Sequence, residues 1–110
     1  MVIKNNSDKS GRALEYIITK LLLIKNKNIR VLGSTLVDQE RDKPKFESLS
    51  PNQQENYING ANELITWLDS NFNLFEASNI SLERLSDNHA KKGDVTDIRL
   101  IINQITVNLS

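Results

Sequence analysis

The chain has 110 residues, 14 of them basic and 14 acidic, so it has the size of one small domain and a formal net charge of zero. Hydrophobic residues make up 38% of the chain, which predicts a folded protein with one modest core. The lack of cysteine excludes disulfides and thiolate chemistry, and the single histidine excludes multi-histidine metal sites. No apolar run is long enough to span a bilayer, and the polar residues 1–10 do not resemble a signal peptide. We therefore expect a cytoplasmic protein with no membrane partner.

The first predicted element is an amphipathic helix over residues 10–24. Its apolar side chains recur at helical spacing and form one broad face: Ala13, Leu14, Ile17, Ile18, Leu21 and Leu22. The side-chain oxygens of Ser7, Asp8 and Ser10 are the expected N-caps. The width of the apolar face predicts a helix that packs on more than one side.

The segment after this helix is less regular. Residues 29–32 fit either a short strand or an anchored loop, and residues 33–51 are predicted to be mostly irregular. Lys43-Pro44-Lys45 disfavours a helix there because proline restricts the residue before it. Phe46 and Leu49 are expected to hold the segment against the core.

A second helix is predicted over residues 51–72. Ser50 is the expected N-cap, and Pro51 fits the first helical position because its missing N–H has no partner to lose there. Gly60 lies within this helix and costs about 1 kcal/mol relative to alanine unless another group packs closely against it.

The C-terminal part of the chain is predicted to form strands at residues 80–85, 95–102 and 105–109, the last two joined by a turn at Asn103-Gln104. The predicted fold is therefore α/β, more specifically α+β, with N-terminal helices packed on a mostly antiparallel C-terminal sheet. All 110 residues are expected to belong to one domain.

Strand alternation predicts which side chains of the hairpin share a face. If Ile98, Leu100 and Ile102 face the core, Asp97 and Arg99 face the opposite, wetter side. The expected core set of the next strand is Ile105, Val107 and Leu109. Thr106, Asn108 and Ser110 then point the same way as Asp97. The hairpin is thus expected to present a carboxylate on one face.

Three carboxylates are candidates for chemistry. Asp94 and Asp97 flank the start of a strand, where they are either solvated charges or ligands of a metal on which further oxygens converge. Glu15 lies beside the apolar stripe of the first helix, where it either reaches solvent or joins them. Spacing alone leaves both interpretations open.

The basic residues near this strand also have two possible roles. Lys91, Lys92 and Arg99 either contact DNA phosphates or simply form a solvated face. Since the net charge is zero, any contact with nucleic acid has to come from such a local patch.

Two motifs of the sequence carry a resemblance to a known family. Asn5-Asn6-Ser7 followed by Gly11-Arg12-Ala13-Leu14-Glu15-Tyr16 is similar to the N-S-x-G-R-A-x-E-Y start of the first helix in the HaeIII-like family of type II restriction endonucleases. Gly93-Asp94-Val95-Thr96-Asp97-Ile98 is similar to its G-D-V-R-D-[IV] strand, with threonine where arginine is usual. The motifs occur in the family's order, and residues 24–85 between them do not align in detail.

The resemblance implies a PD-(D/E)xK nuclease fold and Mg²⁺-dependent hydrolysis of a phosphodiester in double-stranded DNA, at a short GC-rich palindrome. It implies that Asp97, with Asp94 as second choice, is the strand aspartate that holds the metal. Glu15 matches the helix glutamate near the metal in these folds.

One departure from the family concerns the next strand, which in the family ends in Ser-x-Lys-His-Asn-His. Here Asn108-Leu109-Ser110 resembles its beginning, and the lysine that positions water in this type of site is missing. We therefore expect the N-terminal portion of an endonuclease, with an incomplete core and no cleavage activity of its own. An open sheet edge is also expected to favour self-association.

Two other functions fit the same sequence. The chain could be a small α/β interaction or regulatory module whose acidic residues are merely solvated. Alternatively, it could be a non-catalytic nucleic-acid binder that uses Lys91, Lys92 and Arg99.

Overall fold

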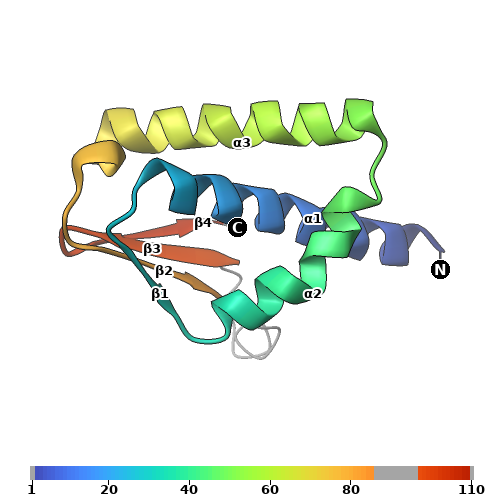
Figure 1. Cartoon of the computed structure of the whole chain (residues 1–110), viewed down its shortest axis with the longest axis horizontal. Helices are drawn as coiled ribbons and strands as arrows, with labels where there is room; N and C mark the ends of the chain where they lie inside the picture. The colour runs from blue at the N-terminus through green and yellow to red at the C-terminus, as the bar shows by residue number, and fades with distance from the viewer. Residues whose placement is uncertain (1, 86–96, 110) are drawn as a thin grey trace.

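The computed structural model describes residues 2–85 and 97–109, with side chains from Ser10 onward. This part of the chain has an α+β fold in which N-terminal helices precede C-terminal strands, as the sequence predicts (Figure 1). The elements in chain order are α1 (Val2–Lys25), β1 (Ile29–Leu32), α2 (Thr35–Glu47), α3 (Pro51–Phe72), the 3-10 helix η1 (Leu74–Glu76), β2 (Ile80–Arg84), β3 (Ile98–Ile102) and β4 (Ile105–Leu109).

The four strands form one sheet in the order β1-β2-β3-β4. β1 runs parallel to β2, whereas β2, β3 and β4 are antiparallel neighbours, so the predicted mostly antiparallel sheet is confirmed. Parallel neighbours need a crossover connection, and here α2 and α3 supply it. The strand at Ile29–Leu32 also settles the choice between strand and loop for that segment.

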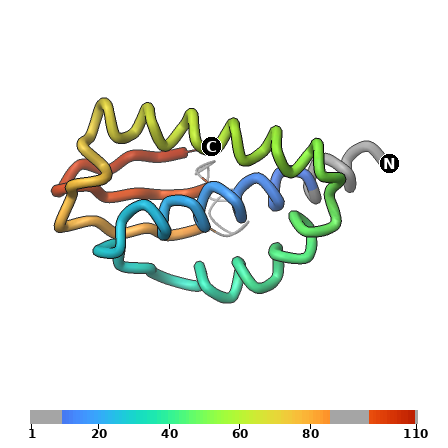
Figure 2. The backbone as a smooth tube through the Cα atoms, turned by 45° about the horizontal axis from the view of Figure 1, so that its top comes forward, coloured from blue at the N-terminus to red at the C-terminus, as the bar shows by residue number. Residues whose placement is uncertain are grey.

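The core lies between the sheet and the helices α1 and α3, which run side by side over one of its faces (Figures 1 and 2). Helix α1 also packs against α2, so it is covered on more than one side, as its wide apolar face predicts. Fully buried side chains that fill this space include Leu22, Ile65, Leu68, Ile80, Leu82, Ile98, Leu100 and Ile102. No helix within residues 2–85 and 97–109 is both long and apolar enough to cross a membrane.

Helix α1 is longer than its apolar pattern indicates. It begins at Val2, so Ser7, Asp8 and Ser10 lie inside the helix and their prediction as N-caps was wrong. Small polar residues favour helix ends, but they do not force one where no proline interrupts the backbone.

Residues 33–51 are the largest correction, because most of this segment is helix α2 rather than a loop. The buried side chains of α2 are Thr35, Asp42 and Phe46, whose spacing is helical but whose character is mostly polar. Pro44 lies near the end of the helix, and the backbone N–H of Ser48 still donates to its carbonyl. The apolar periodicity of the sequence does not reveal this helix because Asp42 lies at the centre of its buried face.

Helix α3 has the predicted bounds and the predicted start. Ser50 and Gln53 form a capping box, in which each side chain bonds the backbone of the other residue, and Pro51 follows directly. An added Cβ at Gly60 would meet nothing within 4 Å. Gly60 therefore lowers the stability of α3, and no close packing against it compensates for this loss.

The β3–β4 hairpin confirms the alternation on β3, where Ile98, Leu100 and Ile102 are buried. On β4, Val107 is buried and Leu109 is half-buried, but Ile105 is 52% exposed, so its prediction as a core residue was wrong. Ile105 is in register with the buried Ile102 of β3, but it lies on the edge strand β4, which has a neighbouring strand on one side only within the described residues. Residues 95 and 96, which were predicted to start β3, lie outside the described part of the chain.

Candidate functional site

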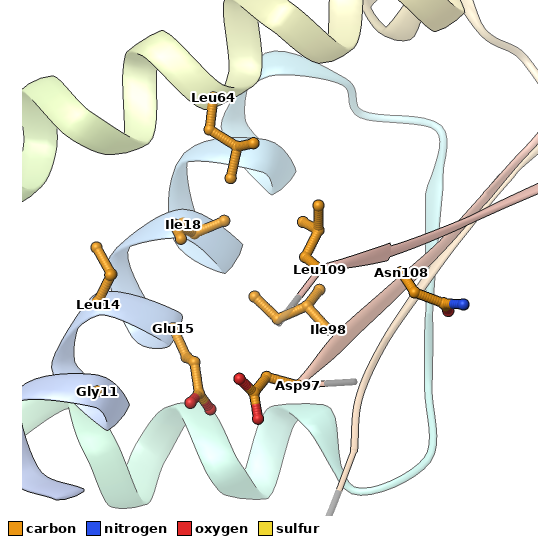
Figure 3. A pocket seen from close by; sticks show the side chains of 9 residues that line it. All are labelled: Gly11, Leu14, Glu15, Ile18, Leu64, Asp97, Ile98, Asn108 and Leu109. Atoms are coloured by element: carbon orange, nitrogen blue, oxygen red, sulfur yellow. The ribbon is translucent and has the colours of Figure 1, made fainter. Parts of the chain in front are cut away.

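A pocket of about 300 Å³ lies between α1, α3 and the β3–β4 hairpin (Figure 3). One side of it is apolar, and the carboxylates of Glu15 and Asp97 lie close to each other at the other side. The residues that line it are Gly11, Leu14, Glu15, Ile18, Leu64, Asp97, Ile98, Asn108 and Leu109. The fold thus brings together two of the three carboxylates that the sequence singles out.

Asp97 directly precedes β3 and is held through its backbone. Its N–H donates to the carbonyl of Leu109 at 2.8 Å, and its carbonyl accepts from the N–H of Leu85 at 2.9 Å. The residue is therefore fixed between its two neighbouring strands, and its side chain is half-buried. Its predicted place on the face opposite Ile98 was wrong, because Asp97 precedes β3 and its carboxylate lies with Ile98 in the pocket on the helix side of the sheet. These two bonds give the carboxylate a defined position at the mouth of the hairpin.

Glu15 reaches the same place from α1. Its neighbours in the helix, Ala13, Tyr16 and Ile17, are buried, and its own side chain is only 22% exposed. Burial raises the pKa of the Glu15 carboxyl above its ordinary value, a hydrogen bond from Arg84 opposes that shift, and the negative charge of Asp97 raises the pKa further. Two like charges that disturb each other in this way would be relieved by a divalent cation between them.

A buried charge network beside the pocket was missed by the sequence analysis. Arg84, the last residue of β2, is almost fully buried and lies 2.6 Å from the carboxylate of Asp42 and 3.0 Å from that of Glu15. Alternation along β2 was a usable signal, since Arg84 shares the face of Ile80 and Leu82, and a charge on an apolar face needs partners.

Asp42 is the anionic centre of this network. It is fully buried and accepts hydrogen bonds from Arg41, Lys45 and Arg84. Burial by itself would raise the pKa of Asp42, but the bonds from these three cationic side chains outweigh it and hold the pKa well below its ordinary range. Asp42 is therefore a structural anion that stays charged, and it does not line the pocket.

The predicted DNA-contacting residues are placed only in part. Arg99 lies on the face of the sheet away from the core, and its Nε donates to the side chain of Asn108, which lines the pocket. Lys91, Lys92 and Asp94 lie outside the described part of the chain, so the structure does not bring them to the site or remove them from it.

The described residues do not include a group of three or more metal-ligating side chains of the His, Cys, Asp or Glu type. Two carboxylates are nevertheless enough for Mg²⁺, which keeps several waters and is often bound through one or two protein carboxylates. The oxygen donors of Glu15 and Asp97 are thus chemically suited to such an ion.

Comparison with known proteins gives no further assignment: neither a family model, nor a curated protein, nor a solved structure matches this chain.

Proposed function

We propose that the chain belongs to a Mg²⁺-dependent DNA endonuclease that hydrolyses phosphodiester bonds at a short palindromic site. The observation that carries this proposal is the convergence of Glu15 and Asp97 on one pocket from distant parts of the chain. Both residues belong to the motifs that resemble the HaeIII-like family.

Glu15 and Asp97 would hold the cation through their carboxylate oxygens, and Asp94 is the third candidate ligand. A bound Mg²⁺ supplies Lewis-acid stabilisation of the phosphate and an activated water. The protein's own part is to fix the two carboxylates, Asp97 through backbone bonds to both neighbouring strands and Glu15 through Arg84. The apolar side of the pocket would keep bulk water away from the carboxylates.

Cation binding is the direct test of this site. Titration calorimetry with Mn²⁺ should show one site on the whole chain, and Glu15→Gln or Asp97→Asn should each remove it. Glu63→Gln, which neutralises an exposed carboxylate on α3, is the matched control and should bind as the parent does. Equal binding by the parent and both pocket variants would reject the site.

Double-stranded DNA is the proposed partner. The resemblance to HaeIII-like enzymes implies GGCC as the GC-rich palindrome. A labelled duplex that contains GGCC should bind with an affinity that falls as salt rises, because contacts to phosphates release counterions. Replacing Lys91, Lys92 and Arg99 together by glutamine should weaken binding and flatten that salt dependence. Unchanged binding by the triple variant would remove these residues from the proposed interface.

Cleavage gives a separate test. Among the described residues no lysine lines the pocket, so we expect the chain to bind Mn²⁺ without measurable cleavage of the duplex. Robust cleavage that survives both Glu15→Gln and Asp97→Asn would show that the reaction takes place elsewhere.

We also propose self-association through β4. Within the described residues β4 pairs with β3 alone, and Ile105 and Thr106 on it are exposed. An unpaired strand edge with an exposed isoleucine is a ready partner for a second strand. Light scattering should show a mass that rises with concentration, and Ile105→Lys should return the chain to a monomer at all concentrations.

A second candidate function is a protein-interaction module without catalysis. A groove of about 430 Å³ between α1 and α2 favours it, because Ile24 and Leu36, which line that groove, are at least half exposed. Under this alternative the Mn²⁺ titration would show no site, whereas Leu36→Glu would abolish binding of a protein partner.

A further inference from the structure

Arg84 occupies an unusual position for a charged residue. It ends β2 on the core face, directly opposite Ile98 in the register with β3, and Ile98 lines the pocket of Glu15 and Asp97. Its side chain is only 2% exposed. A guanidinium removed from water in this way is tolerated only when its N–H groups have partners.

The partners of Arg84 come from two different helices. Its Nη2 donates to Glu15 Oε1 on α1 at 3.0 Å and to Asp42 Oδ2 on α2 at 2.6 Å. Its Nη1 donates to Gln39 Oε1 on α2 at 3.0 Å. Nη2 therefore bridges the carboxylates of Glu15 and Asp42, and the bond from Nη1 to Gln39 holds the orientation of the guanidinium plane.

The backbone of Arg84 is fixed to α2 as well. Its N–H donates to Thr35 Oγ1 at 2.9 Å, and the same hydroxyl donates to the carbonyl of Leu32 at 2.6 Å. Because both the main chain and the guanidinium are tied to α2, the direction in which Arg84 presents its N–H groups to Glu15 is set by the fold.

These contacts form a chain that ends in the pocket. Asp42 is held by Arg41 and Lys45, Asp42 then holds Arg84, and Arg84 holds Glu15. Of these residues only Glu15 lines the pocket. A carboxylate has about four lone-pair sites, so the bond at Oε1 still allows Glu15 to bind a cation.

From this arrangement we infer that Arg84 is a positioning residue of the cation site, which aligns the carboxylate of Glu15 with that of Asp97. The inference rests on the proposed function. Arg84 is not a phosphate ligand, because its side chain is buried and its Nη groups already serve three acceptors. In metal sites generally, loss of a group that orients a ligand lowers metal affinity by about 10–100-fold.

The test compares variants that disturb the same network at different points. Arg84→Lys keeps the charge but has a single nitrogen, so it loses the planar fork whose second nitrogen is held by Gln39, and Asp42→Asn removes the anion that shares Nη2 with Glu15. Lys45→Met is the matched control, since it removes a partner of Asp42 without touching Arg84 or Glu15. Mn²⁺ affinity of each whole-chain variant is measured by calorimetry below its melting temperature, and paramagnetic broadening of carboxylate signals reports which side chains lie next to the ion.

Arg84→Lys and Asp42→Asn are expected to lower Mn²⁺ affinity by about 10-fold or more, while Lys45→Met leaves it within about twofold despite a loss of stability. Broadening should reach Glu15 and Asp97 in the parent and become weaker at Glu15 in Arg84→Lys. If affinity instead falls in all three variants in proportion to stability, or in none of them, Arg84 has only a structural role and the inference is overturned. If the parent chain binds no Mn²⁺, the proposed function fails together with this inference. If the parent binds Mn²⁺ but the variants do not differ as expected, only this inference fails.

Discussion

The Arg84 guanidinium and the Asp42 carboxylate meet at 2.6 Å, both almost completely removed from solvent. The pair joins the end of β2 to the middle of α2, two elements far apart in the sequence. Removing one member of a buried pair is costly because it leaves the other charged and uncompensated, even where replacing both would cost little. Replacing either Arg84 or Asp42 alone should therefore lower the free energy of unfolding strongly.

Asp42→Asn is expected to lower the free energy of unfolding by about 3 kcal/mol at pH 7, because Arg84 then stays buried without its closest anion. The hydrogen bonds to Asp42 lower its folded pKa, so its contribution is complete above the unfolded pKa of about 3.9 and is lost as the pH falls towards the folded pKa. Urea unfolding followed by circular dichroism should thus show a gap between parent and variant that is constant from pH 7 to 5 and narrows below about pH 4. A gap that stays the same down to pH 3 would contradict this assignment, and Glu63→Gln serves as the exposed control.

Gly60 and Gly33 are expected to respond in opposite directions to alanine. Gly60→Ala should stabilise the chain by up to about 1 kcal/mol, because the residue lies inside α3 and its Cβ would meet nothing within 4 Å. Gly33→Ala should destabilise it by about 1–2 kcal/mol, because Gly33 has a φ of +62°. Thermal unfolding measures both changes.

The origin of the Gly33 effect can be separated by a double variant. A Cβ at Gly33 would lie 2.5 Å from Glu83 Oε2, the far end of a flexible side chain that can move away. Gly33→Ala combined with Glu83→Ala should therefore keep most of the loss. Full recovery in the double variant would assign the loss to the side-chain clash instead of the backbone.

The turn of the β3–β4 hairpin predicts a stabilising substitution. Asn103 and Gln104 have φ values of 49° and 76°, a pair of left-handed residues that is typical of type I′ turns and favours Asn-Gly. Gln104→Gly should raise the free energy of unfolding by about 1 kcal/mol. Asn103→Gly should change it less, because asparagine tolerates the left-handed region, and a larger gain from Asn103→Gly would contradict the turn assignment.

Cation binding should also raise the stability of the folded chain. At a Mn²⁺ concentration about 100 times its Kd, the gain is about 2.7 kcal/mol, provided that the unfolded chain does not bind the ion. The melting temperature of the parent should rise accordingly, whereas Glu15→Gln and Asp97→Asn should show no rise. An equal rise in the parent and in both variants would point to binding outside the pocket.

Some elements follow directly from local patterns. The capping signal at Ser50 and the spacing of apolar residues locate α3, and the strict alternation around Asn103-Gln104 locates the hairpin. These features depend on neighbours along the chain, so they can be predicted before any long-range contact is known. The same alternation predicts Asp97 on the face away from the core, and this prediction was wrong. Asp97 precedes β3, so the alternation of the strand does not fix it, and its carboxylate lies beside Glu15 in the pocket that Ile98 also lines.

Other features depend on contacts between distant residues, and local patterns do not contain them. Helix α2 buries Asp42, which is stable there only because Arg84 comes from another element to pair with it. The approach of Glu15 to Asp97 likewise depends on how α1 lies across the end of the hairpin.

The sequence by itself thus determined the α+β class, α3, the hairpin and the residues worth testing. Only the tertiary structure decided which of the acidic side chains meet and which are neutralised. The physical reason is that hydrophobic spacing and turn chemistry act between near neighbours in the chain. Charge pairing in a low-dielectric interior depends instead on which distant residues the fold brings together.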